Sequence, residues 1–219
     1  MNNLITLFLL AVLSSSALAF KMPSLPGAGS NEEASSGQSA ADAQEAIVGD
    51  FKAALGHVLQ AQAQVATALG MGELAKKSRF EAARLSGDDC AKSCLEEVTE
   101  ASADGQQKIE EKMAEGSDLD ANSKKELTKA FPPLLKGTLI MSKLAPKAKD
   151  WARSASSEIK GAGFTGAAKL KKKLGTGLYI VKVTPKLITE WTKTTSSFVS
   201  FGKKAGVPTD GSTGKEMDG

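Results

Sequence analysis

The chain has 219 residues, of which 28 are Lys or Arg, 25 are Asp or Glu, one is His and two are Cys, and aromatic residues make up 5%. This length suits one domain or two small ones, and so few histidines and cysteines leave few ways to build a metal or nucleophilic site. The net charge of +3 hides an asymmetry: residues 20–135 carry 12 basic and 19 acidic side chains, whereas residues 136–204 carry 15 basic and 3 acidic ones. Such a split predicts a charged partner or contact between the two halves.

The first residues have the pattern of a secretion signal. Leu4 to Leu13 are apolar or nearly so, and Ala17-Leu18-Ala19 places small side chains at positions −3 and −1 of a cut before Phe20. The apolar run is shorter than the roughly 20 residues that a transmembrane helix needs. No Lys or Arg precedes it, and a buried N-terminal helix is the alternative interpretation. We expect residues 1–19 to be a cleaved signal peptide, a mature protein that is periplasmic or secreted, and no transmembrane segment after cleavage.

A helical domain is expected between two flexible segments. Residues 20–40 and 206–219 are rich in Gly, Pro and Ser and lack apolar periodicity, which is typical of a flexible arm and a disordered tail. The helical domain is expected over residues 41–205, with an acidic first half to about residue 135 and a basic second half from residue 136.

Three helices are predicted in the acidic half. The first runs from about Ala41 to Leu69 and ends at Gly70 and Gly72, because six residues at intervals of three and four share one face. That face holds Phe51, Leu55, Val58, Gln62, Val65 and Leu69. A second helix is predicted over residues 73–85. Residues 86–89 offer capping oxygens for a third, which extends to about Ala114. Its apolar stripe holds Cys94, Val98, Ala101, Ile109 and Met113.

Shorter helices separated by prolines are predicted in the basic half. Ser123 to Glu126 fits a capping box, which predicts a short helix that ends at Phe131-Pro132-Pro133. Pro133 is expected to open another helix, and Pro146 to kink or restart it toward Ile159.

The predicted chain continues with a flexible break over residues 161–166 and a basic helix over residues 167–174. Residues 178–183 favour a strand or a helix, and Thr184-Pro185 is expected to begin the last helix. The predicted fold class is all-α, an irregular bundle of roughly five to seven helices.

Cys90 and Cys94 are the only cysteines. On a predicted helix their spacing places both sulfurs on one face, one turn apart. In an exported protein we expect a disulfide, which would close a very short loop and leave the tertiary fold almost unchanged. Inert thiols, or a redox or metal role, are the alternatives.

Other motifs lack the context that their chemistry needs. His57 lies beside the first apolar stripe, and its neighbours indicate no nucleophile or ligand set. Residues 161–166 match G-x-G-x-x-G, but a helical segment precedes them where a dinucleotide site needs a strand. The paired carboxylates are expected to be solvated. We predict no catalytic residue, no metal and no cofactor, with a small carboxylate-based enzyme as the third alternative for function.

The strongest functional feature is a group of four lysines in the basic half: Lys169, Lys171, Lys172 and Lys173. Aromatic residues also gather in this part of the chain, because seven of the ten after residue 19 lie between residues 131 and 201. A basic amphipathic helix with aromatic neighbours can bind an anionic membrane, at about 1 kcal/mol per lysine. The alternative is that the basic half packs against the acidic half and the lysines form its solvated face.

The sequence therefore predicts an exported, non-enzymatic helical protein that acts by binding or scaffolding. Its partner is expected to be an unidentified protein or an anionic membrane surface, and not nucleic acid, because secretion separates the chain from it. The alternative is a peripheral binder of anionic lipid or envelope surfaces through residues 136–204. A large apolar cavity would favour a lipid carrier, and a solid core a scaffold.

Overall fold

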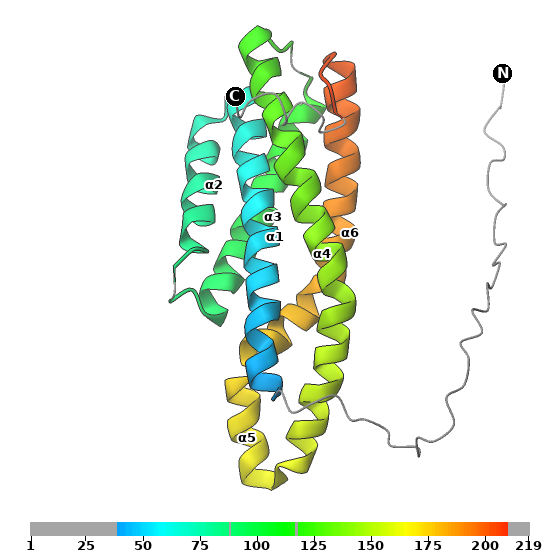
Figure 1. Ribbon diagram of the computed structural model, residues 1–219. Coiled ribbons are helices and arrows are strands. Elements are labelled where there is room, and N and C mark those ends of the chain that lie inside the picture. The colour runs from blue at the N-terminus through cyan, green and yellow to red at the C-terminus, as the bar shows by residue number, and fades with distance from the viewer. Residues whose placement is uncertain (1–38, 88, 117, 210–219) are drawn as a thin grey trace, which may run out of the picture. The chain divides into compact units, whose positions relative to one another are not determined.

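The structure, a computed structural model, describes residues 39–87, 89–116 and 118–209. These residues form six helices and no strands, which confirms the predicted all-α bundle (Figure 1). The helices are α1 (Ala40–Ala68), α2 (Gly72–Arg84), α3 (Lys92–Ala114), α4 (Ala121–Gly161), α5 (Gly163–Lys173) and α6 (Gly175–Lys204). The expected signal peptide at 1–19, the arm up to residue 38 and the tail from residue 210 lie outside the described residues.

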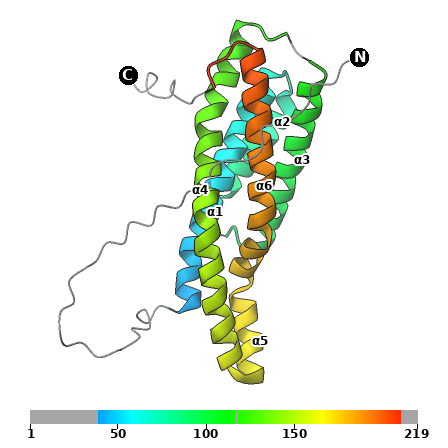
Figure 2. The ribbon, with the colours of Figure 1, turned by 90° about the vertical axis from the view of Figure 1, so that its right-hand side faces the viewer.

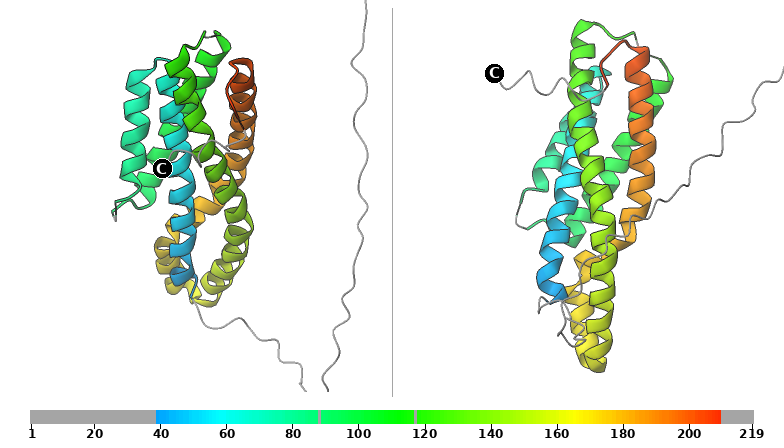
Figure 3. Two further views of the ribbon diagram at one scale, coloured as in Figure 1. Left: turned by 45° about the horizontal axis from the view of Figure 1, so that its top comes forward. Right: turned by 45° about the vertical axis from the view of Figure 1, so that its right-hand side comes forward.

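Three long helices form the frame of the bundle. In the right-hand view of Figure 3, α4 lies between α1 and α6. The α2–α3 hairpin packs against α1, and Figure 2 shows α3 beside α6. The short α5 follows α4 at the end of the bundle and leads back into α6 (Figure 1).

The apolar face predicted for α1 is confirmed, because all six residues of the stripe are buried. The helix begins where the Ser39 hydroxyl accepts a hydrogen bond from the Asp42 amide. It ends before Gly70, which has a φ of 71° and thus a left-handed conformation that favours glycine. Both ends therefore follow from local sequence signals.

The start of α3 differs from the expectation. Its N-cap is Ala91, which makes no side-chain cap, so residues 86–89 do not cap it; Asp88 lies outside the described residues. Its buried face holds Leu95, Val98, Ser102, Gly105 and Ile109. The predicted stripe is confirmed at Val98 and Ile109, whereas its other members, Cys94, Ala101 and Met113, are only partly buried. It missed Leu95, and it missed Ser102 and Gly105 because neither is large and apolar. Ser102 is buried because the Gln62 side-chain amide donates a hydrogen bond of 2.9 Å to its carbonyl oxygen.

The prediction of several short helices after residue 120 is wrong, because α4 is one helix of 41 residues with three prolines inside it. Its N-cap is Asp120 instead of Ser123, and the Asp120 carboxylate accepts a hydrogen bond of 2.7 Å from the Ser123 amide. An internal proline costs about 3 kcal/mol, whereas one fully buried large apolar side chain contributes about 1.5–3 kcal/mol. The buried face that outweighs the prolines includes Leu127, Phe131, Leu134, Met141, Leu144 and Trp151.

Residues 178–183 are helical, and α6 runs without interruption through Thr184 and Pro185. The expectation that these two residues begin a helix is therefore wrong. The α6 residues that point inward recur at intervals of three and four: Gly177, Ile180, Thr184, Leu187, Trp191, Thr194, Phe198 and Gly202. Thr184 fits this buried face because its hydroxyl donates to the carbonyl oxygen of Ile180 at 2.7 Å.

Glycines stand where α4 meets its neighbours most closely. A Cβ atom added to Gly177 would lie 2.7 Å from Trp151 Cζ2, and one added to Gly202 would lie 2.7 Å from Phe131 Cζ. On α4 itself, a Cβ atom at Gly137 would lie 2.8 Å from the Ala54 carbonyl oxygen of α1. Only a hydrogen atom fits at each of these three positions.

The end of the helical domain also packs into the core. Residues 206–209, which the sequence placed in the tail, are among the described residues, and Val207 is buried in the cluster around Phe131 and Phe198. Its amide donates a hydrogen bond of 2.9 Å to the Gly202 carbonyl oxygen. The chain therefore turns back onto α6 before the described residues end.

Replacing Gly177 by alanine tests the close packing of α4 on α6. We expect Gly177→Ala to lower the free energy of unfolding by about 1–3 kcal/mol, because the new methyl group overlaps the Trp151 ring. The matched control is Gly49→Ala in α1, where an added Cβ atom has no neighbour within 4 Å. It should raise the free energy by about 0.5–1 kcal/mol through helix propensity. Urea denaturation measures both, and equal stabilisation of the two variants would contradict the packing account.

Candidate functional site

Basic side chains gather where α4, α5 and the turn between them form one end of the bundle. We term residues 153–173 the basic tip. It carries six basic residues and one acidic residue, Glu158. All six basic side chains are exposed: Arg153, Lys160, Lys169, Lys171, Lys172 and Lys173. The four lysines singled out from the sequence therefore lie together on one short exposed helix.

The two faces of α5 differ in character. Gly166, Ala167 and Leu170 face inward and are partly buried, but no residue of α5 is fully buried. The outward face holds Phe164, Ala168, Lys171 and Lys172, at intervals that place them on one side of a helix. Phe164 is 95% exposed. A bare aromatic ring and two ammonium groups thus share one surface.

The N-terminal part of α1 holds the C-terminal end of α5 in place through hydrogen bonds. The side-chain amide of Gln44 donates to the Lys173 carbonyl oxygen at 3.3 Å, and its oxygen accepts a hydrogen bond of 2.9 Å from the Gly177 amide. Nearby, the Trp151 indole N–H donates to the Ala40 carbonyl oxygen at 2.7 Å. These bonds tie the junction of α5 and α6 to the frame.

The acidic half does not neutralise the basic tip within the described residues. Only one ion pair there joins residues 136–204 to the acidic half, between Lys147 and Asp50 at 2.8 Å. The four lysines of α5 form no ion pair with any described carboxylate. Glu158 accepts a hydrogen bond from the Ala40 amide at the start of α1 instead. Arg153 pairs with Asp150 at 3.1 Å, and the positive charge of the α5 lysines faces solvent.

A local structural role accounts for part of this charge. Lys171, Lys172 and Lys173 lie in the last turn of α5, where cations interact favourably with the helix dipole. The helix dipole gives no reason for an exposed phenylalanine in the first turn. The combination of Phe164 with the lysines is what makes the tip a candidate site.

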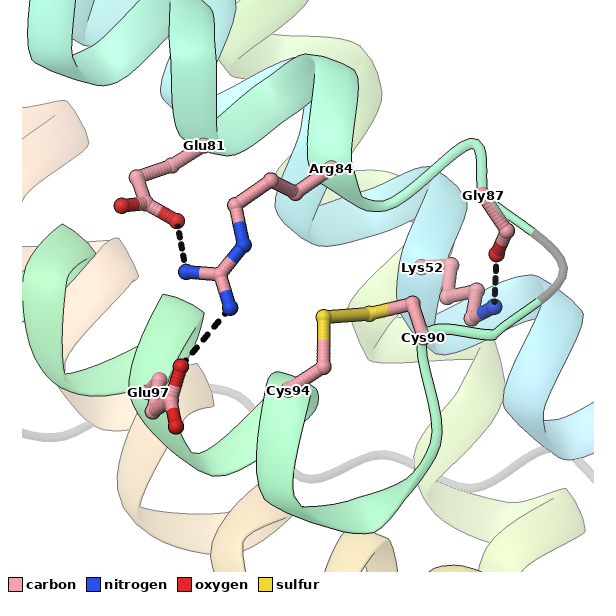
Figure 4. The surroundings of a disulfide bond; sticks show 7 residues. All are labelled: Lys52, Glu81, Arg84, Gly87, Cys90, Cys94 and Glu97. Atoms are coloured by element: carbon pink, nitrogen blue, oxygen red, sulfur yellow. Dashed lines mark hydrogen bonds and ion pairs between the residues drawn. A yellow bond between two sulfur atoms is a disulfide. The ribbon is translucent and has the colours of Figure 1, made fainter.

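The two cysteines lie close together, as their spacing predicts, and the structure joins them with their Cα atoms 5.1 Å apart. The expectation that both stand on a helix is wrong, because Cys90 precedes the N-cap of α3. The bond ties the α2–α3 loop to the first turn of α3. Beside it, Arg84 pairs with Glu81 at 2.9 Å and with Glu97 at 2.7 Å (Figure 4).

The other sequence candidates lie apart from the basic tip. His57 lines a shallow hollow of about 230 Å³ with Lys52, Gln60 and Leu85. The described residues hold no group of three His, Cys, Asp or Glu side chains placed to bind a metal ion. Residues 161–166 span the end of α4, Ala162 and the first turn of α5, so the expected flexible break and the expected start of the basic helix at residue 167 are wrong. A helix precedes the glycines where a dinucleotide site needs a strand.

Sequence patterns did not indicate an open cleft of about 810 Å³ between the ends of α3 and α6. Ser196, Ser197 and Ser200 line it. Serines at this spacing are also typical of any helix face in contact with water, so the sequence pattern did not distinguish them. Charges of both signs meet there, including Glu110, Asp118, Lys124 and Lys204. The lining therefore selects no ligand by charge.

No known protein family, curated protein or solved structure matches the chain. Across the part of the chain that the structure describes, no helix is both long enough and apolar enough to cross a membrane.

Removing the disulfide tests its structural role. We expect Cys90→Ala/Cys94→Ala to lower the free energy of unfolding by at most about 2 kcal/mol, because the bond closes a loop of only a few residues. Urea denaturation measures this change, and far-UV circular dichroism should show unchanged helix content. Loss of the cooperative transition would instead mean that the bond holds the whole bundle together.

His57 predicts a specific pH dependence. Burial, and then the nearby Lys136 ammonium, hold the pKa of its imidazole below the ordinary value of 6.5. The unfolded chain thus binds more protons, so stability should fall as the pH drops from 7 through 6.5 toward the folded pKa. His57→Gln should abolish this contribution.

As the only histidine, His57 can be titrated by NMR without ambiguity. A midpoint at or above 6.5 in the folded protein would contradict the assigned environment.

Proposed function

We propose that the protein is an exported, non-enzymatic binding protein that attaches to anionic lipid or envelope surfaces through its basic tip. The observation that carries the proposal is the outward face of α5, where Phe164 and unpaired lysines are exposed together. Attraction of lysines to an anionic surface adds about 1 kcal/mol per residue near that surface. The proposal includes removal of residues 1–19 and a periplasmic or extracellular location.

Charge pairing favours an external partner over contact between the two halves. If the halves neutralised each other, several lysines of residues 136–204 would face carboxylates of α1 to α3. Within the described residues, Lys147 alone does so. The excess positive charge is therefore available to a partner.

The filled interior supports a protein that binds its partner through its surface over one that carries a lipid in a cavity. Large side chains fill the core between the long helices, among them Phe51, Phe131, Phe198, Leu59 and Met141, each less than 2% exposed. The hollows found in the described residues are open clefts at the surface. A bundle with a filled core can present a rigid surface to a partner.

The carboxylate pairs also have structural partners. Glu97 pairs with Arg84 at 2.7 Å, and Glu96 pairs with Lys92 at 3.4 Å. Both pairs connect neighbouring parts of the α2–α3 hairpin or of α3 itself. This supports a structural role for these carboxylates over the acid–base role that an enzyme would need.

Co-sedimentation with vesicles that contain phosphatidylglycerol tests the proposal. The protein should bind at low salt and dissociate as salt rises, because ions screen exposed charges. Replacing Lys169, Lys171, Lys172 and Lys173 by glutamine should lower binding by roughly a thousandfold, at about 1 kcal/mol per lysine.

The matched control removes four exposed lysines from elsewhere in the bundle: Lys77, Lys108, Lys124 and Lys125. It changes the net charge equally and should retain most of the binding. Equal losses in both variants would contradict the proposal, and absence of vesicle binding by the unmodified protein at low salt would exclude anionic lipid as the surface that it binds.

A further inference from the structure

Among the described residues, Phe164 is the most exposed of the large apolar side chains that reach the surface. It is 95% exposed, compared with 64% for Phe80, 53% for Leu139 and 37% for Leu135. A ring this exposed adds almost nothing to the packing of the fold. Its apolar surface is free to be buried by a partner.

The backbone around Phe164 carries small side chains. Gly161, Ala162 and Gly163 precede it, and Thr165 and Gly166 follow it. None of these residues has a side chain long enough to shield the ring. Phe164 therefore projects from the first turn of α5 as an isolated apolar group.

The helix that carries the ring has charges of one sign only. Residues 161–177 contain no Asp or Glu, and Lys171 and Lys172 lie on the same face of α5 as Phe164. An apolar group that shares a helix face with lysines matches the layered chemistry of an anionic bilayer, where phosphates lie above hydrocarbon. An acidic protein would instead need a pocket for the ring within a carboxylate surface.

We propose that Phe164 is an apolar anchor that enters the hydrocarbon boundary of an anionic bilayer while Lys171 and Lys172 contact the lipid phosphates. The inference rests on the proposed function and names its partner as a lipid bilayer instead of an acidic protein or a soluble polyanion. Charge and one apolar group then act together, as stable peripheral attachment requires two signals.

Replacing the ring by a small polar group tests the anchor. Phe164→Ser should weaken binding to phosphatidylglycerol vesicles by about tenfold, because the ring no longer leaves water on binding. The matched control is Phe80→Ser, which removes an exposed phenylalanine from α2 and should leave binding unchanged. Both variants should unfold at the same urea concentration as the unmodified protein, because neither side chain is buried.

Phe164→Trp reports on the depth of insertion. The native Trp151 and Trp191 are 5% and 2% exposed, so they give a constant background of buried emission. The added tryptophan should emit at longer wavelength in water, shift to shorter wavelength on vesicles, and be quenched by lipids with brominated acyl chains.

The outcomes separate the two proposals. If vesicles bind Phe164→Ser as tightly as the unmodified protein, and the added tryptophan is not quenched, the anchor is overturned while attachment by charge stands. If the unmodified protein fails to bind vesicles at low salt but binds heparin through the α5 lysines, a bilayer is overturned as the partner. If it binds neither, the proposed function fails with it.

Discussion

The bundle depends on how closely α4 approaches α1 and α6. Gly137, Gly177 and Gly202 leave room for the backbone of α1 and for the rings of Trp151 and Phe131, so the three long helices interlock. The same contacts place the tip. Trp151 also donates a hydrogen bond to the start of α1, and there Gln44 holds the junction of α5 and α6. The exposed face of α5 is therefore displayed by a rigid frame.

In the α2–α3 hairpin, polar contacts and a covalent bond add to the apolar packing of residues such as Leu95, Val98 and Ile109. Gln62 and Ser102 meet in the interior between α1 and α3, and the side-chain oxygen of Gln62 has no hydrogen-bond partner among the described residues. A buried unpaired group of this kind costs about 1–3 kcal/mol. The disulfide and the Arg84 ion pairs lie at the other end of the hairpin, where they limit its opening. The bundle thus combines a frame of three long helices with a hairpin whose turn is closed by a covalent bond and ion pairs.

Sequence patterns predicted the helices with continuous apolar faces and failed where tertiary packing overrides a local signal. The α1 stripe was predicted because its large side chains recur regularly, whereas Pro132 and Pro146 suggested helix ends that packing against α1 and α6 overrides. The lysines of the tip were found from composition alone. Phe164 was missed because the exposure of one aromatic residue depends on which neighbours reach it, and these are set by the turn between α4 and α5.

In the proposed arrangement, the rigid frame presents the basic tip to an anionic bilayer. Amide hydrogen exchange of the full chain can be compared with and without phosphatidylglycerol vesicles. On binding, exchange should slow in α5 and in the adjoining end of α4, while α2 and α3 exchange as they do in solution. Slowing confined to the α2–α3 hairpin or to the cleft between the ends of α3 and α6 would contradict it.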